Sequence, residues 1–358
     1  MILDGRVESS VAQAVHVLRE GGLVGMPTET VYGLAANAED VQAVAKVFVR
    51  KGRPAEHPLI VHVAQAAQAS HFAADAPLFA QRLMDQLWPG PLTLILPRRA
   101  GVAQAAAGGQ NSIGLRCPSH PVAQALLRAC VIEGIHGLAA PSANLFGRIS
   151  PTAAAHVQAD LGQDLLVLDG GACEVGIESS IVDCTRARAV LLRPGLISRA
   201  RIEAACGESL ADELDMAQQA GQNAPRASGT LEAHYAPRAK LRLMDAKSLQ
   251  RALDLLGGDI DATRQPGTVS AATRNASTGG SGADQATIAV YSRAVLASRS
   301  PGILRRRMPD DAVETARQLF AVLRGFDDQG VKLIWVETPP DEPQWEGVRD
   351  RLQRAAAA

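Results

Sequence analysis

The sequence predicts an α/β fold built on a twisted, mixed sheet flanked by helices. One observation is the alternation of short apolar runs with stretches whose apolar residues recur at helical spacing. Another is the polar stretch 207–238, which separates this series from a second, shorter one of the same kind. With 358 residues the chain exceeds one average domain, so we expect two domains, 1–206 and 239–358, joined by a linker.

The larger domain is predicted from its local patterns in chain order. Val11, Ala14, Val15 and Leu18 share one helical face, and the glycine pair 21–22 ends that helix. Further helices are expected over residues 41–48, 76–87 and 119–127. Strands are expected over residues 23–26, 59–63, 92–96, 112–116, 137–144, 165–171, 179–184 and 190–195. This rhythm favours a sheet that mixes parallel and antiparallel neighbours.

The smaller domain shows the same alternation. Its strands are expected over residues 240–244, 287–292 and 331–337, and its helices near 247–256, near 310–324 and from about 343. Between them, residues 257–286 are rich in Gly, Ser, Thr, Asn and Asp. Such a composition cannot bury a core, so this segment is predicted to be a disordered insertion.

The bulk composition excludes several classes of protein. The formal net charge of −1 gives no global field for a polyanion, so any anion site must be a local cluster. The five cysteines are odd in number and form no C-x-x-C, which argues against a zinc site or a redox pair. No run approaches the roughly 20 apolar residues of a membrane span. We therefore expect a cytoplasmic protein with reduced thiols and no membrane contact.

Polar residues gather where the predicted strands end. In PTETVYGL, Thr28, Glu29 and Thr30 follow a strand that ends at Pro27, which is where α/β proteins usually bind ligands. The alternative is a well-bonded turn. The chain has no glycine-rich phosphate loop, no nucleophile elbow and no H-E-x-x-H, so a nucleotide enzyme of this sequence would not use the common cradles.

Four cations lie beside predicted strand ends. Lys51 and Arg53 flank a glycine in the stiff turn KGRP, and Arg116 and Arg193 each close an apolar strand. For Lys51 and Arg53 the alternative is a solvated helix C-terminus, where cations favour the dipole. Four like charges at one sheet edge are stabilised if they bind a highly charged anion, and a nucleoside triphosphate meets that requirement.

Several ordered motifs carry a family resemblance. PTETVYGL, KGRP..HPL, GPLTLIL, SIGLR.P, APSAN.....SPT and the pair GIESSIVD and LLRPG occur in this order. Over residues 8 to about 206 the chain resembles the YrdC-like family of threonylcarbamoyl-AMP synthases. HYAP in the linker and the second α/β unit are similar to the long form of that family, which implies a Rossmann-like C-terminal domain.

The resemblance implies an activity. ATP, L-threonine and bicarbonate or CO2 would give threonylcarbamoyl-AMP and pyrophosphate, for N6-threonylcarbamoyladenosine formation in tRNA by a downstream transferase. The threonine carbamate supplies the nucleophile, so positioning and charge stabilisation suffice without a catalytic triad. Mg²⁺ would be held mainly by the ATP phosphates, with no protein metal site.

The resemblance also implies site residues. Those for L-threonine are Thr30, His62, Arg116, Ala140 and Ser180. Those for ATP are Arg53, His57, Ser112, Ser142, Asn144, Ser150, Arg193, His234, Tyr235 and Arg238. Lys51, Arg53 and Arg116 would supply the catalytic charge. At position 57 many relatives carry Asn where this chain has His, and both can donate a hydrogen bond.

Two other functions are weighed against this one. A non-catalytic double-stranded RNA binder would use a concave basic face, but the near-zero net charge argues against a broad basic footprint. A related carbamoyl-transfer enzyme for hydrogenase maturation would carry zinc-binding C-x-x-C pairs, which this chain lacks. A contact with RNA remains compatible with the synthase.

Overall fold

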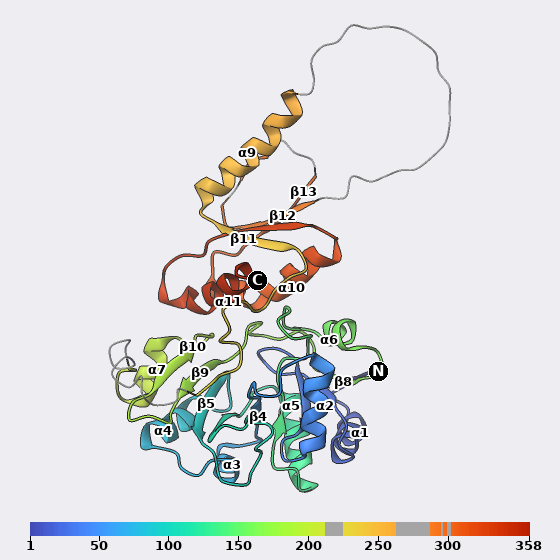
Figure 1. Cartoon of the computed structure of the whole chain (residues 1–358), viewed down its shortest axis with the longest axis vertical. Helices are drawn as coiled ribbons and strands as arrows, with labels where there is room; N and C mark the ends of the chain where they lie inside the picture. Colours follow the sequence, from blue (N-terminus) through green and yellow to red (C-terminus); the bar gives the residue numbers. More distant parts are fainter. Residues whose placement is uncertain (212–224, 263–286, 295, 299–301) are drawn as a thin grey trace.

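The computed structural model describes residues 1–211, 225–262, 287–294, 296–298 and 302–358. Two units are stacked along the long axis of the molecule, the N-terminal unit being the larger (Figure 1). An extended segment of the chain, drawn in yellow, connects the two units (Figure 1).

The larger unit is built on a ten-stranded sheet in the order β1-β8-β2-β3-β7-β4-β6-β5-β9-β10. Neighbours such as β4 and β6 are parallel and others such as β5 and β6 are antiparallel, which confirms the predicted mixed sheet. The strands are β1 (Ile2–Asp4), β2 (Val24–Met26), β3 (Gly33–Asn37), β4 (Ile60–His62), β5 (Leu92–Pro97), β6 (Ser112–Arg116), β7 (Leu138–Ala139), β8 (Leu166–Asp169), β9 (Ser180–Asp183) and β10 (Val190–Arg193).

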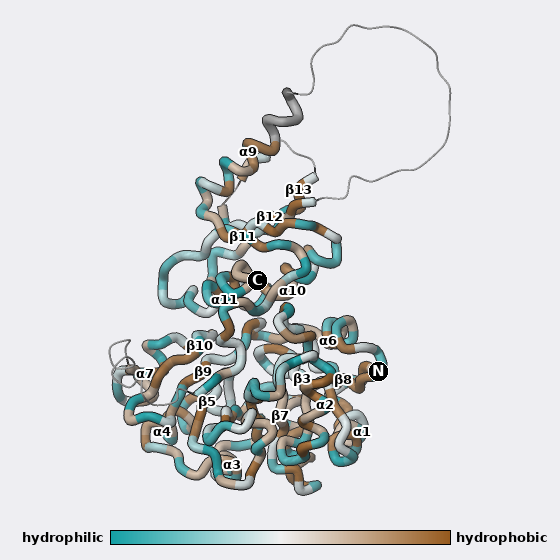
Figure 2. Tube along the Cα trace, viewed as in Figure 1, coloured by the Kyte–Doolittle hydropathy of each residue, from teal (hydrophilic) through white to brown (hydrophobic). Residues whose placement is uncertain are grey.

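Helices cover both faces of this sheet. Helices α1 and α5 share one apolar core with β2 and β8, and α2, α4, α6 and α7 share another with β4 and β5. The helices are α1 (Glu8–Arg19), α2 (Val41–Lys51), α3 (Ala69–Phe72), α4 (Leu78–Leu87), α5 (Pro121–Ile132), α6 (Ala154–Leu161) and α7 (Arg199–Cys206), with a 3-10 turn at Ala66–Gln68. Figure 2 shows hydrophobic stretches along β5, β9 and β10, as burial on both faces requires.

Helix α2 illustrates how the sequence places a site residue. Asp40 caps its N-terminus by accepting hydrogen bonds from the backbone N–H groups of Gln42 and Ala43. Gly52 ends it in the left-handed region with φ 62°, which favours glycine. The chain therefore turns at Gly52, and Arg53 lies in the loop that leads to β4.

Some elements of the larger unit were not predicted. They are β1, β3, the 3-10 turn at Ala66–Gln68, α3, α6 and α7. Strand β3 reads Gly-Leu-Ala-Ala-Asn and is almost wholly buried, so it lacks the polar-apolar alternation that marks a strand. Its antiparallel pairing with β2 makes residues 27–32 a tight connection within the sheet.

The C-terminal unit has a four-stranded, wholly parallel sheet in the order β11-β14-β12-β13. Its strands are β11 (Lys240–Met244), β12 (Ile288–Ser292), β13 (Ile303–Arg307) and β14 (Leu333–Glu337). Its helices are α9 (Ala246–Ala262), α10 (Ala312–Asp328) and α11 (Glu346–Ala356), with a 3-10 turn at Pro343–Trp345. The expected α/β unit is confirmed, and β13 was not predicted.

Two sequence predictions fall partly outside the described residues. The insertion was predicted to begin at residue 257, but residues 257–262 complete helix α9, so that start is wrong. The remainder, 263–286, lies outside the described residues, as does 212–224 of the linker.

The two units share one apolar core. Val31, Ile149 and Ile177 of the larger unit pack in the same buried cluster as Phe320 and Leu352 of the smaller one. At one contact the backbones meet so closely that a Cβ on Gly347 would lie 2.7 Å from the carbonyl oxygen of Gly195. The C-terminal unit is therefore docked by close packing as well as by the linker.

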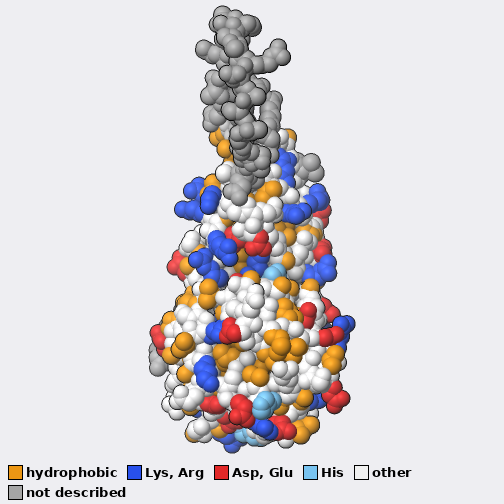
Figure 3. Space-filling view, turned by 90° about the vertical axis from the view of Figure 1, so that its right-hand side faces the viewer, with side chains coloured by type: hydrophobic (Ala, Val, Ile, Leu, Met, Phe, Trp, Pro, Cys, Tyr) orange, Lys and Arg blue, Asp and Glu red, His pale blue; other side chains and the backbone are white. Residues whose placement is uncertain are grey.

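The helices and the surface bear on two expectations, that the protein makes no membrane contact and that it is not a nucleic-acid binder with a broad basic face. Among the described residues no helix is both long and apolar enough to cross a membrane. On the face shown in Figure 3, Lys and Arg are interspersed with acidic side chains over the larger unit and are denser over the C-terminal unit. This face of the larger unit does not carry the continuous basic surface that a nucleic-acid binder presents.

Candidate active site

A pocket lies where the larger unit meets the linker. Its wall combines strand ends of the large sheet with linker residues 228–235. The lining residues are Thr28, Val31, Gly33, Arg53, Ile60, His62, Arg116, Ala140, Pro141, Ser142, Glu178, Ser179, Arg193, Ser228, Gly229, His234 and Tyr235. The pocket therefore contains the convergent arginines that the sequence predicted for one sheet edge.

Three guanidinium groups in this wall are buried. Arg53 is 9% exposed, Arg116 is 4% exposed and Arg193 is 3% exposed. The Nε groups of Arg53 and Arg116 have no hydrogen-bond partner among the described residues. Buried charges with unused donors are costly, so these groups are arranged for an anionic ligand.

Arg116 ends β6 and is held by the turn after β2. Its Nη2 lies 2.7 Å from Glu29 Oε1 in a buried ion pair, and its Nη1 donates to Thr30 Oγ1 at 2.8 Å. Burial raises the pKa of Glu29, but the charge and hydrogen bond of Arg116 outweigh this and leave it below its usual value. Glu29 is therefore ionised and fixes the Arg116 fork in one orientation.

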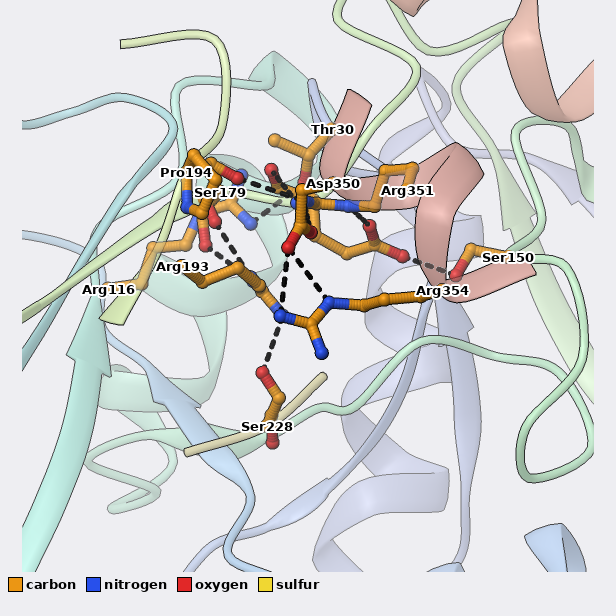
Figure 4. Close-up of polar contacts among 11 residues, drawn as sticks. Thr30, Arg116, Ser150, Ser179, Arg193, Pro194, Ser228, Asp350, Arg351 and Arg354 are labelled. Carbon is orange, nitrogen blue, oxygen red and sulfur yellow. Dashed lines mark hydrogen bonds and ion pairs between the residues drawn. The ribbon is translucent and has the colours of Figure 1, made fainter. Parts of the chain in front are cut away.

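Arg193 ends β10 and connects two sides of the pocket. It donates to the carbonyl oxygen of Ser179 at 3.1 Å, to Ser179 Oγ at 3.2 Å and to the carbonyl oxygen of Ser228 at 2.7 Å (Figure 4). Arg53 donates to Ser228 Oγ at 3.2 Å and to the carbonyl oxygen of Pro58 at 3.0 Å. Both arginines thus hold the linker at Ser228.

Lys51 lies behind the pocket wall. Its ammonium group donates to the carbonyl oxygens of Ser142 at 2.5 Å and Asn144 at 2.6 Å, which shapes the loop after β7. Burial, reinforced by the charge of Arg53, lowers the pKa of Lys51 to about 7. A phosphate group entering the pocket would restore its charge.

The described linker residues 225–238, called the strap here, close the pocket. His234 and Tyr235 lie edge to face at 4.1 Å, and Tyr235 packs on Phe320 of the C-terminal unit at 5.5 Å. The enclosed space is about 50 Å³, far below the roughly 300–1,000 Å³ of typical ligand pockets. A nucleotide therefore requires the strap to withdraw from Ser228 onward.

The predicted site residues divide into two groups in the structure. Eight line the pocket, namely Arg53, His62, Arg116, Ala140, Ser142, Arg193, His234 and Tyr235. The others support its wall or lie beside it, namely Lys51, Thr30, Asn144, Ser150, Ser180, Ser112, His57 and Arg238.

The supporting residues have identifiable partners. Ser180 Oγ donates to the carbonyl oxygen of Ile197, and Ser150 Oγ donates to Glu178. Asn144 donates to the carbonyl oxygens of residues 145 and 148. These bonds fix loops of the wall, so the side chains act on a ligand through the backbone they hold.

Three predicted residues lie outside the pocket wall. Ser112 lines a neighbouring small cavity beneath strap residues 226–228. His57 packs edge to face on Phe146 at 5.4 Å. Arg238 is exposed, and its backbone N–H donates to Asp327. The structure does not bring Arg238 to the pocket.

Residues that sequence reasoning missed include Glu178, Ser179 and Ser228 of the pocket wall. Glu178 is a carboxylate directly before a buried strand, and this signal was present in GIESSIVD. Ser228 has no such signal, because its position depends on how the strap crosses the sheet.

The pocket offers no ligand set for Mg²⁺. Its carboxylate Glu178 and the adjacent Glu29 are both committed to guanidinium groups. The described residues that gather metal-type side chains are Glu39, His71 and His136, beyond the opposite ends of β3 and β7. The residues of the pocket therefore do not fit a protein-held metal.

Two buried histidines predict acid sensitivity. Burial and the charge of Arg116 lower the pKa of His62 to about 3. Burial, reinforced by Arg53 and opposed by Glu178, lowers that of His234 to about 3. Unfolded histidine titrates near ~6.5, so between these values only the unfolded chain binds the proton. The contribution of each histidine to the free energy of unfolding is fully present above pH ~6.5. It falls as the pH drops toward 3, by about 1.4 kcal/mol for each pH unit.

Urea unfolding at pH 7, 6 and 5 measures how steeply the free energy of unfolding falls with pH. His234→Gln should reduce this slope, whereas His16→Gln, on the exposed face of α1, should leave the slope unchanged. An equal slope in the wild type and His234→Gln would contradict the assignment.

Comparisons with known proteins agree with this geometry. Residues 16–195 match the family model described as telomere recombination, and residues 197–357 match that of the threonylcarbamoyl-AMP synthase C-terminal domain. The chain is 36% identical to the threonylcarbamoyl-AMP synthase of Bacillus subtilis, covering 98% of this chain and 93% of that protein. It is 34% identical to that of Pyrococcus abyssi, covering 98% and 94%.

Solved structures match over nearly the whole chain. P. abyssi Sua5 complexed with L-threonine has a TM-score of 0.80 at 32% identity and covers 98% of this chain and 95% of that one. A variant of P. abyssi Sua5 has a TM-score of 0.82 at 31% identity and covers 99% and 96%. On its sequence, its two domains and its pocket, the chain belongs to the family of threonylcarbamoyl-AMP synthases.

Proposed function

We propose that this protein makes threonylcarbamoyl-AMP from L-threonine, bicarbonate or CO2, and ATP, releasing pyrophosphate. With bicarbonate, one water is also released. The observation that carries the proposal is the set of three buried guanidinium groups sharing one small pocket with a neutral histidine. Such a pocket suits an adenylylation in which the substrates supply the nucleophile and the leaving group.

The threonine end is assigned to Arg116 and His62. The Arg116 fork, oriented by Glu29 and Thr30, suits the threonine carboxylate. His62 is neutral, and its Nδ1 has no hydrogen-bond partner among the described residues, so it is suited to form a hydrogen bond with the bound threonine. Ala140 would bound the substrate side chain, and Ser180 would hold the strand that carries Ser179.

The ATP end is assigned to Arg53 and Arg193, with Ser142 on the same wall. A carbamate oxygen attacks the α-phosphorus, the bond to the β-phosphate oxygen breaks, and pyrophosphate leaves. The guanidinium groups would stabilise the negative charge that develops on the phosphoryl oxygens. Lys51, Asn144 and Ser150 would act through the loops they fix. Strap residues His234 and Tyr235 would close over the nucleotide and exclude water.

Several partners are inferred from the chemistry of the product. A threonylcarbamoyl adenylate is an activated acyl donor, so a transferase must pass its acyl group to tRNA, giving N6-threonylcarbamoyladenosine. Because the described pocket offers no carboxylate cage, Mg²⁺ would arrive on the ATP phosphates. We expect the cytoplasm as location, where the five unpaired, buried cysteines stay reduced.

The double-stranded RNA-binding alternative is not favoured. Its cations would have to face the phosphate backbone, whereas Arg53, Arg116 and Arg193 are buried around a small cavity. An RNA contact elsewhere on the synthase is left as a prediction.

Pyrophosphate release tests the proposal. The protein is incubated with ATP and bicarbonate, and with threonine, serine or no amino acid. We expect release that requires an amino acid and is fastest with threonine, together with the mass of threonylcarbamoyl-AMP. Release that ignores threonine, or none, would contradict the proposed function.

Arg53→Ala is expected to weaken ATP binding by about tenfold to a hundredfold, since it removes a buried charge from the phosphate site. Titration calorimetry with a non-hydrolysable ATP analogue measures this. Arg50→Ala is the matched control, because Arg50 lies in the last turn of α2, three residues before Arg53, and binds Asp164 and the carbonyl oxygen of Leu161 away from the pocket. Unchanged affinity in Arg53→Ala would remove Arg53 from the site.

A further inference from the structure

A single side chain of the C-terminal unit contacts three segments of the pocket wall. Arg351, in α11, is 0% exposed. Its guanidinium group donates to Glu178 Oε2 at 2.8 Å, to the carbonyl oxygen of Glu178 at 3.1 Å and to that of Pro194 at 2.9 Å. It also lies over the ring of Tyr235, 5.3 Å from the centroid. Figure 4 shows Arg351 near Pro194 and Ser179 of the larger unit.

Glu178 makes this contact consequential. It lines the pocket, it is 7% exposed, and its second oxygen accepts a hydrogen bond from Ser150 Oγ. Burial raises the pKa of Glu178, but the charges of Arg351 and Arg193 outweigh this and keep the pKa below its usual value. The wall of a pocket suited to a triphosphate therefore contains a negative charge.

Without Arg351 this carboxylate would have two effects on an anionic ligand. It would repel phosphate groups directly, and it would compete with them for Arg193, a pocket cation whose charge already lowers the pKa of Glu178. Arg351 donates two hydrogen bonds to Glu178, one to its carboxylate and one to its carbonyl oxygen, and holds it against the C-terminal unit. With the bond from Ser150, the Arg351 ion pair satisfies the charge of the carboxylate there.

We propose that Arg351 is a positioning residue for the nucleotide, which holds the Glu178 carboxylate aside so that Arg193 remains available to phosphate. The C-terminal unit thus completes the electrostatics of a site whose ligand-binding side chains belong to the larger unit and the strap. The inference rests on the proposed function in taking ATP as the ligand, and it extends to any polyphosphate.

The test separates charge from packing. Arg351→Met keeps an unbranched apolar side chain beside Tyr235 and leaves Glu178 unpaired. We expect its KM for ATP to rise by about tenfold or more with little change in kcat, because the loss is in anion binding. In the double variant Arg351→Met/Glu178→Gln the misplaced charge is absent, and we expect KM to return to within about threefold of the wild type.

Arg349→Met is the matched control. Arg349 lies two residues earlier in α11, and its partners among the described residues belong to the C-terminal unit: the carbonyl oxygens of Pro340 and Glu342, and the Asp341 carboxylate. It should leave KM unchanged. Thermal unfolding of each variant reports whether α11 stays docked. If Arg351→Met does not fold, the KM for ATP of the folded double variant, compared with that of the wild type, decides the test.

Several outcomes would overturn the inference. One is a double variant that folds and binds ATP as weakly as Arg351→Met, since Arg351 would then act only by packing. Another is wild-type affinity in Arg351→Met. Calorimetry with inorganic triphosphate keeps the two proposals distinguishable, because it reads the anion site even if no threonine-dependent pyrophosphate is released. The wild type could release no pyrophosphate while the variants still bind triphosphate with the expected order of affinities. That result would refute the proposed function but not the positioning role of Arg351.

Discussion

Arg116→Met should reduce threonine-dependent pyrophosphate release by about a hundredfold or more. Removing one partner of a buried ion pair costs roughly 3–5 kcal/mol, and about 1.4 kcal/mol corresponds to a factor of ten. Here the loss leaves the buried Glu29 carboxyl without its ion-pair partner in the turn after β2, and it deprives the amino acid carboxylate of its proposed partner. Steady-state kinetics with threonine as the varied substrate measure the effect.

The matched comparison is Arg128→Met, which removes an exposed guanidinium from α5 and should leave turnover unchanged. Arg116→Lys keeps the charge but loses the two-pronged geometry, so it should recover only part of the activity. Arg116→Met with wild-type kcat/KM for threonine would refute the assignment of Arg116 to the threonine end.

Truncation after Gly207 should abolish most of the turnover and destabilise the larger unit. It removes the strap and with it Ser228, His234 and Tyr235 of the pocket wall. It also exposes Val31, Ile149 and Ile177, at about 1.5–3 kcal/mol for each fully buried side chain of this size. We expect a loss of at least about two orders of magnitude in kcat/KM, since Glu178 and Asp160 also lose their arginine partners.

A cleaved, undeleted chain provides the control. A protease site placed within residues 212–224 and cut after purification leaves all the described contacts in place. Because these contacts are between packed surfaces, the cut protein should keep its activity. A truncated protein with full turnover would show that neither the strap nor the C-terminal unit takes part.

The sequence predicted the parts of the site that depend on local pattern. A charged residue that closes an apolar strand must find a partner, and Arg116 and Arg193 were located on that basis. The stiff turn after Gly52 placed Arg53 by the same local logic. All three do line one pocket.

What could not be predicted depends on residues that are distant in sequence. Glu178 is paired only because Arg351 arrives from a helix 173 positions further along. Ser228 contributes its carbonyl oxygen to Arg193 only because the strap crosses β10 there. Strand β3 was missed for a different reason, since burial on both faces removes the alternation that reveals a strand.

The apolar cluster that spans both units has a thermal consequence. The side chains of this cluster come from both units, so neither unit can unfold without exposing apolar side chains of the other. Heating should therefore produce a single endotherm instead of two. A nucleotide bound beneath the strap would then raise the melting point of the whole molecule. It should also shield peptide bonds of the C-terminal sheet from proteolysis, although that sheet never touches the nucleotide.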